Sequence, residues 1–122
     1  MNIESLTCAM QIKKESEIRM KSALKLHFKD IIILNYIYKT VSSSKNNKIK
    51  MKDIIEHCEF AQAEVVTIIR KLQKEHQLLT KKRNTNDERT VSVSLTTKGQ
   101  KEIPYILENA NRIIEDETQK AQ

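Results

Sequence analysis

Apolar positions recur with helical spacing over most of the chain. Residues 1–27 show this period loosely and predict an N-terminal helix, whereas residues 28–41 have a wider apolar face that is typical of a buried core helix. Residues 42–47 form a polar break of serine, lysine and asparagine. Residues 97–118 again carry apolar side chains at steps of three and four, which predicts a C-terminal helix.

The middle of the chain has a different pattern. Residues 50–76 read as two short helices separated by a tight connection at 59–61, which is the spacing of a helix-turn-helix. Residues 78–95 read as a hairpin, because its second half alternates apolar and hydroxyl side chains in the manner of a half-buried strand. The element order predicts a winged helix-turn-helix, a mainly α fold with a small β-hairpin wing (α+β), in a single domain of residues 1–122.

Composition excludes most enzyme classes. The 122 residues include one glycine, which cannot build a Gly-rich phosphate loop, and aromatics are only 4% of the chain. His27, His57 and His76 lie on three separate predicted elements, and no paired-carboxylate or nucleophile motif occurs. We therefore expect no enzyme activity, no metal and no cofactor, and no small-molecule ligand is evident.

The chain has a formal net charge of +6, which favours nucleic acid, an anionic membrane surface or an acidic protein as partner. Residues 45–98 hold twelve basic and seven acidic side chains, so the excess lies in the middle of the chain. No segment approaches the ~18 apolar residues of a membrane span, and no secretory signal precedes the first helix. Two cysteines are too few for a disulfide scaffold, so a cytoplasmic location is expected.

The second helix of the pair is the candidate recognition helix. Steps of 100° per residue place Val65, Ile68, Ile69 and Leu72 on one face, toward the core. In a major groove, the other face would offer an amide for base edges, small groups for thymine methyls, and cations for guanine or phosphate. A solvated helix face is the alternative interpretation. The candidate DNA-contacting residues are Gln62, Ala63, Val66, Thr67, Arg70, Lys71 and Lys74.

The hairpin is the second candidate element. Lys81, Lys82 and Arg83 enter its loop, and Asp87, Glu88 and Arg89 leave it. Cations at a hairpin tip can enter a narrow minor groove, where the potential is most negative, and a neighbouring acid can hold an arginine in one rotamer. A charged, solvated turn is the alternative.

Residues 81–91, a basic run followed by a short turn and Asp-Glu-Arg-Thr-Val, resemble the wing of the staphylococcal accessory regulator (SarA) family, a branch of the MarR-type winged-helix regulators. Residues 51–55 and 65–66 resemble that family's helix-turn-helix, and residues 95–99 are similar to the wider MarR pattern that opens its dimerisation helix. The resemblance implies a homodimeric transcriptional regulator on AT-rich promoter DNA. It gives the wing role to Arg83 and Arg89, with Asp87 and Glu88 beside them.

The terminal helices are the expected dimer interface, because one small domain has few internal surfaces for both apolar stripes. Packing within one chain is the alternative. Pro104 is expected to kink or split the last helix, and Gly99 to weaken it. The candidate dimerisation residues are Ile3, Leu6, Met10, Ile106, Leu107, Ala110, Ile113 and Ile114.

Cys8 lies in the first predicted helix, where members of the resembled family carry a redox-active cysteine. Oxidation there could shift the spacing of two DNA-binding heads; a buried small apolar residue is the alternative. Cys58 ends a short helix on its apolar side and reads as core. The alternative function is a winged-helix protein-interaction module that uses its basic face on an acidic protein.

Overall fold

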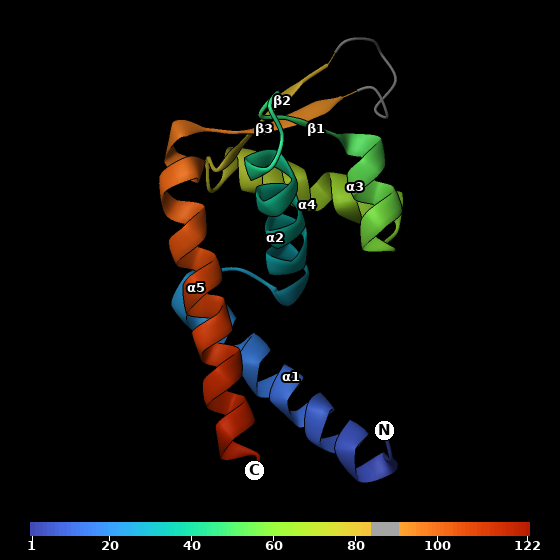
Figure 1. Ribbon diagram of the computed structural model, residues 1–122, viewed down its shortest axis with the longest axis vertical. Helices are drawn as coiled ribbons and strands as arrows, with labels where there is room; N and C mark the ends of the chain where they lie inside the picture. Colours follow the sequence, from blue (N-terminus) through green and yellow to red (C-terminus); the bar gives the residue numbers. More distant parts are fainter. Residues whose placement is uncertain (84–90) are drawn as a thin grey trace. The chain divides into compact units, whose positions relative to one another are not determined.

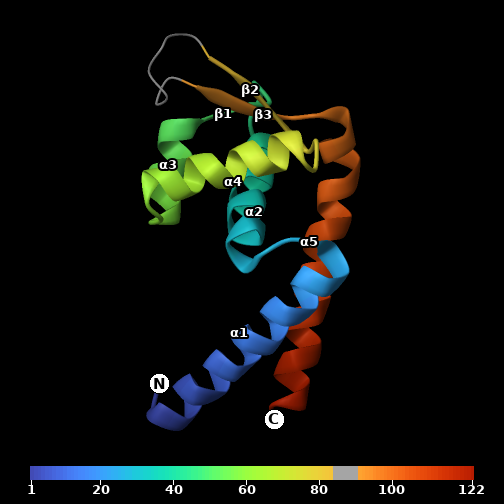
Figure 2. The ribbon, with the colours of Figure 1, turned by 180° about the vertical axis from the view of Figure 1, so that it is seen from behind.

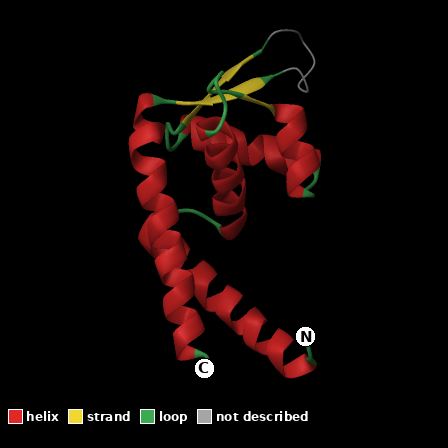
Figure 3. Ribbon diagram, viewed as in Figure 1, coloured by secondary structure: helices red, strands yellow, loops and turns green. Residues whose placement is uncertain are grey.

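The computed structural model describes residues 1–83 and 91–122, and every structural statement below refers to them. They form two compact units: a central unit, Ile32–Pro104, and a terminal unit of Met1–Ile31 with Tyr105–Gln122. Figures 1 and 3 show the elements, which in chain order are α1 (Ile3–Leu24), α2 (Phe28–Ser42), β1 (Ile49–Lys50), α3 (Met51–Cys58), α4 (Gln62–Lys74), β2 (Leu79–Lys82), β3 (Ser92–Leu95) and α5 (Thr97–Lys120). The predicted mainly α fold with a small β component is confirmed.

The central unit contains the predicted helix-turn-helix and hairpin. Helix α3 ends where Glu59 takes a left-handed backbone conformation with φ of 57°, and α4 starts at Gln62, so the connection at 59–61 is confirmed. The strands of the hairpin, β2 and β3, pair antiparallel, with Leu79 opposite Leu95 and Lys82 opposite Ser92. In Figures 1 and 2 the sheet lies along one side of α2, α3 and α4.

Strand β1 is a feature that the sequence pattern does not predict. It joins the hairpin to give a three-stranded antiparallel sheet of order β1-β3-β2. Ile49 pairs with Val93 and Lys50 with Ser92, and the Met51 N–H donates to the Val91 carbonyl oxygen at 2.8 Å. A strand of two residues is too short to show an alternation, so Lys50, which was expected to begin the short helix, belongs to the sheet instead.

In the terminal unit, α1 begins with a cap, since the Asn2 side chain accepts a hydrogen bond from the Ser5 N–H at 2.8 Å. The Arg19 guanidinium donates to a carboxylate oxygen of Glu117 at 2.8 Å and to Asp116 at 3.5 Å. This ion pair joins α1 to the C-terminal part of α5, which cross in Figures 1 and 2. Fully buried Met20 contributes to the apolar core of this unit.

Helix α5 continues through Pro104 without interruption, so the expectation that the proline splits the helix is wrong. Pro104 lacks one N–H donor, but every other residue of the helix can still make its hydrogen bond. The preceding Ile103 is fully buried, and its packing anchors this turn. A bend at Pro104 stays a prediction.

Candidate nucleic-acid interface

Helix α4 has a buried apolar face, as its pattern predicts. Val65, Ile69 and Leu72 are fully buried and Ile68 is 8% exposed. Each such side chain stabilises the fold by about 1.5–3 kcal/mol. Together the four fix the rotation of α4 about its own axis and leave the opposite face to solvent.

That opposite face is polar and exposed along the whole helix. Gln62 lies at its first turn, Thr67 in the middle and Arg70 toward its end, and all three are exposed. The Thr67 hydroxyl donates to the Ala63 carbonyl oxygen at 2.8 Å, so it can offer a ligand only its oxygen and methyl group. Of the other predicted contact residues, Ala63 and Lys74 are exposed, whereas Val66 and Lys71 are half-buried.

An aromatic stack, which the sequence analysis does not predict, holds α3 against α2. The rings of Tyr36 and His57 lie with their centroids 3.8 Å apart and their planes within 10° of parallel. Stacked rings contribute about 0.5–1.5 kcal/mol beyond the area they bury. The pair positions the first helix of the helix-turn-helix, and the long separation of the two residues in the chain leaves no local signal of it.

The wing enters from β2 with a run of cations. Lys82 and Arg83 are exposed, and Lys81 is half-buried because its position alternates with theirs across the sheet. The predicted wing residues Asp87, Glu88 and Arg89 lie outside the described residues. Within the described part, the basic run before the loop follows directly from a strand that pairs with β3 and packs near α4.

The predicted dimerisation residues divide into two groups. On α1, Ile3 is 83% exposed, Leu6 51% and Met10 64%, which is unusual for apolar side chains on one helical stripe. On α5, Ala110 and Ile113 are buried within the chain itself, so their side chains have little surface to offer a second copy. The remaining α5 residues, Ile106, Leu107 and Ile114, are half-buried.

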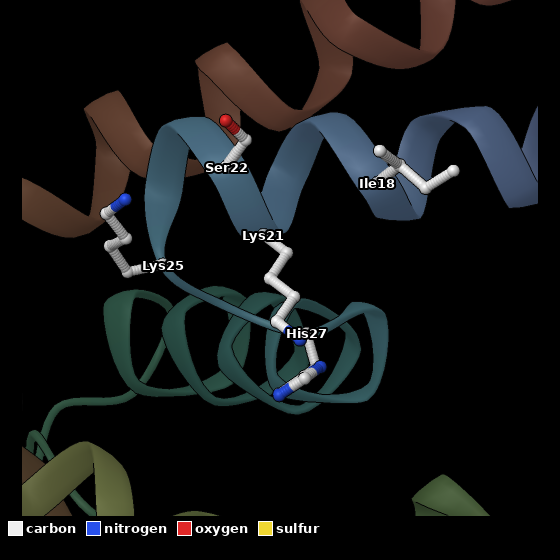
Figure 4. A pocket seen from close by; sticks show the side chains of 5 residues that line it. All are labelled: Ile18, Lys21, Ser22, Lys25 and His27. Atoms are coloured by element: carbon white, nitrogen blue, oxygen red, sulfur yellow. The ribbon is translucent and has the colours of Figure 1, made fainter.

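A cavity of about 480 Å³ lies beside the end of α1 (Figure 4). Its lining comes from Ile18, Lys21, Ser22, Lys25 and His27, all in the terminal unit. Two ammonium groups and no carboxylate line it, so it lacks the acid–base pair of a hydrolytic site.

Other kinds of site were sought in residues 1–83 and 91–122. No group of three or more His, Cys, Asp or Glu side chains is placed to hold a metal ion there. Among the helices of these residues, none is both long enough and apolar enough to cross a membrane. His27 is exposed and His76 half-buried, which confirms the expectation that they lie at the surface or its boundary.

Comparison with known proteins identifies the family. Residues 12–106 match the family model described as transcriptional regulator SarA/Rot. The transcriptional regulator SarA of Staphylococcus aureus is 33% identical over 95 residues, which cover 78% of this chain and 73% of the relative. The chain belongs to the SarA/Rot family of transcriptional regulators. It is therefore a transcriptional regulator, which implies DNA binding, and not an enzyme.

Solved structures similar to this SarA/Rot-family chain show the MarR-type winged-helix fold. AbsC, a MarR-family regulator from Streptomyces coelicolor, has a TM-score of 0.72 at 14% identity, with 98% of this chain and 76% of AbsC covered. MepR, a transcription regulator of a Staphylococcus aureus multidrug efflux pump, has a TM-score of 0.69 at 16% identity, with coverage of 98% and 82%. At these identities the likeness establishes the fold, and it confirms the predicted winged helix.

The two cysteines of this family member have different surroundings. Cys8 is half-buried, and its sulfur lies 3.9 Å from the Ala121 carbonyl oxygen in the terminal unit. Its role as a redox switch stays a prediction. Cys58 is buried and burial raises the pKa of its thiol, which disfavours the reactive thiolate, so its assignment to the core is confirmed.

Proposed function

We propose that the protein binds AT-rich promoter DNA as a homodimer, with α4 in the major groove and the wing in the minor groove. The observation that carries the proposal is the orientation of α4. Its four apolar side chains are buried in the core, and Gln62, Thr67 and Arg70 stand exposed on the other face. An amide, a small side chain and a cation are the groups that contact base edges, thymine methyls and guanine or phosphate.

The wing supports the same arrangement. Lys82 and Arg83 are exposed at the end of β2, where the chain enters the wing loop. Arginine and lysine are drawn to the narrow minor groove of A-tracts, where the negative potential is enhanced. Among the similar structures, a mutant of MarR from E. coli is described as complexed with operator DNA, and a mutant of MepR as bound to an oligodeoxyribonucleotide. For Arg83, Asp87, Glu88 and Arg89 the wing role rests on the sequence motif.

The homodimer is proposed from the exposed apolar stripe of α1. Ile3, Leu6 and Met10 lie at steps of three and four on one helix, and together they would expose an apolar strip to water in a single chain. A second copy with the same strip would cover it in a two-fold interface. Two recognition helices would then read half-sites separated by about one helical turn or a multiple of it.

A mobility-shift assay with two duplexes of equal length, one AT-rich and one GC-rich, tests the proposal. We expect the protein to retard the AT-rich duplex at a lower concentration, and DNase footprinting to show two half-sites on one side of the helix. No retardation of either duplex would overturn DNA binding and favour the acidic-protein partner. Equal retardation of both duplexes would overturn the AT preference, and a single protected half-site would overturn the dimer arrangement.

A further inference from the structure

The sheet of the central unit has an outer face that neither the recognition helix nor the wing loop includes. Because directly paired residues project to the same side of a sheet, the pairing of Ser92 with both Lys50 and Lys82 places these three side chains in one row. The adjacent row, in which Ile49 and Val93 are buried, faces the core. Lys50 and Lys82 are exposed and Ser92 is half-buried, so their row faces outward.

This outer sheet face carries only hydroxyl and ammonium groups. Beyond the row of Lys50, Ser92 and Lys82, the next row pairs exposed Thr80 with half-buried Ser94. Lys48 alternates with buried Ile49 and so lies on the same side as Lys50. In the described residues this face holds three lysines and no carboxylate.

The lysines are also unneutralised by neighbours in sequence. Residues 45–52 contain Lys45, Lys48, Lys50 and Lys52 and no acid, and all four lysines are exposed. None of the ion pairs of the described residues involves any of them. A surface that keeps several ammonium groups unpaired has a positive potential that attracts a polyanion.

We propose that the outer sheet face, through Lys50 and Lys82, binds the phosphate backbone of the same DNA duplex that α4 reads. Lysine ammonium and serine hydroxyl groups are the donors that typically contact phosphate and fix a protein's register without reading sequence. The two lysines stand on strands two spacings apart, about 10 Å, so they can contact different phosphates. The inference rests on the proposed function, to which it adds a second, sequence-independent contact surface.

The position of β1 supports a single duplex as the occupant. Lys50 is the residue directly before α3, the first helix of the helix-turn-helix. In this motif the first helix crosses the DNA backbone while the second enters the groove. Lys50 therefore stands at the edge of the unit from which the backbone is approached, and Lys82 stands at the base of the wing.

Fluorescence anisotropy with a labelled 40-base-pair AT-rich duplex tests the inference, using Lys50→Ala, Lys82→Ala, Lys50→Arg and the wild type over a salt series. We expect each alanine variant to bind about threefold to tenfold more weakly, with the slope of log K against log salt smaller by about one. The loss should be the same on a GC-rich duplex, and Lys50→Arg should keep the wild-type slope. Lys101→Ala, an exposed lysine of α5, is the matched control for the change in net charge.

The outcomes separate the inference from the function on which it rests. If the wild type binds DNA and both alanine variants match Lys101→Ala in affinity and slope, the outer sheet face is not a DNA surface. A loss of affinity with an unchanged slope would point to altered folding and would also overturn the contact. Absence of binding by the wild type would overturn the proposed function itself, and the outer sheet face with it.

Discussion

Gly99 passes so close to Leu78 that no side chain fits between them. A Cβ atom at position 99 would clash with the Leu78 carbonyl oxygen and lie 3.1 Å from its carbonyl carbon. The same oxygen accepts a hydrogen bond from the Thr96 N–H at 3.1 Å, so it cannot move aside freely. The only glycine of the chain thus permits the start of α5 to pack against the segment that leads into the wing.

Gly99→Ala is predicted to destabilise the protein by about 1–3 kcal/mol, the usual cost of overpacking a close contact. In an exposed helix the same change would stabilise by up to about 1 kcal/mol, so the sign of the effect is diagnostic. Chemical denaturation measures it. Gln100→Ala, at the next and exposed position, is the control and should stay within about 0.5 kcal/mol of the wild type. A Gly99→Ala variant as stable as the wild type would show that the contact relaxes without cost.

The ion pair of the terminal unit predicts a pH dependence. Hydrogen bonds from Arg19 and Lys120 hold the pKa of Glu117 below its ordinary value of 4.5. Because the pKa is lower in the folded than in the unfolded chain, the pair stabilises the fold above about pH 4.5, and this contribution is lost as the pH falls through the folded-state pKa.

Glu117→Gln is accordingly expected to be less stable than the wild type at pH 7, with the difference narrowing by pH 3. Urea denaturation at the two pH values measures this. Glu115→Gln, an exposed neighbour on the same helix, should follow the wild type at both. An equal deficit at pH 3 and pH 7 would mean that the carboxylate charge of Glu117 contributes nothing.

For the recognition helix, Arg70→Ala is predicted to weaken DNA binding by about 1–3 kcal/mol, since a good cation contact to a base or phosphate is lost from the exposed face of α4. Its circular dichroism should be unchanged because the side chain is outside the core. Arg112→Ala, an exposed arginine of α5, controls for the change in charge. Equal affinities of the two variants would remove Arg70 from the interface.

Replacement of the exposed stripe on α1 by charge should separate the proposed dimer. Ile3→Lys combined with Leu6→Lys places two ammonium groups where a second copy would pack, while both positions are exposed enough in one chain for it to fold. Analytical ultracentrifugation should then give the 14.2 kDa of one chain, against twice that for the wild type and for Ile32→Lys, whose site is 37% exposed in the central unit. A wild type that sediments as one chain would contradict the dimer.

Periodicity predicts the helices, the hairpin and the rotation of α4 because side-chain spacing directly reflects which face is buried. It predicts them here to within a few residues, and Val65, Ile69 and Leu72 are all buried as expected. It does not say against what a face packs. Ala110 and Ile113 have the spacing expected of a dimer stripe, but they are buried within their own chain.

Features that depend on distant pairing leave no such signal. The Tyr36–His57 stack joins two helices, and β1 exists only because Ile49 pairs with Val93 across a long stretch of sequence. For the same reason the sequence alone points to the recognition helix and the wing but not to the row of Lys50 and Lys82, which is formed by strand register. The basic run at residues 45–52 could have marked that surface.

The salt dependence of binding tests the central claim, that the basic central unit binds DNA, most directly. Anisotropy titrations of the wild type with the AT-rich duplex between 50 and 200 mM salt, values on the order of those that separate strong from weak phosphate binding, give the slope of log K against log salt. The account predicts a steep negative slope, corresponding to release of several counterions from phosphates. A flat titration, or no binding at the lowest salt, would contradict it.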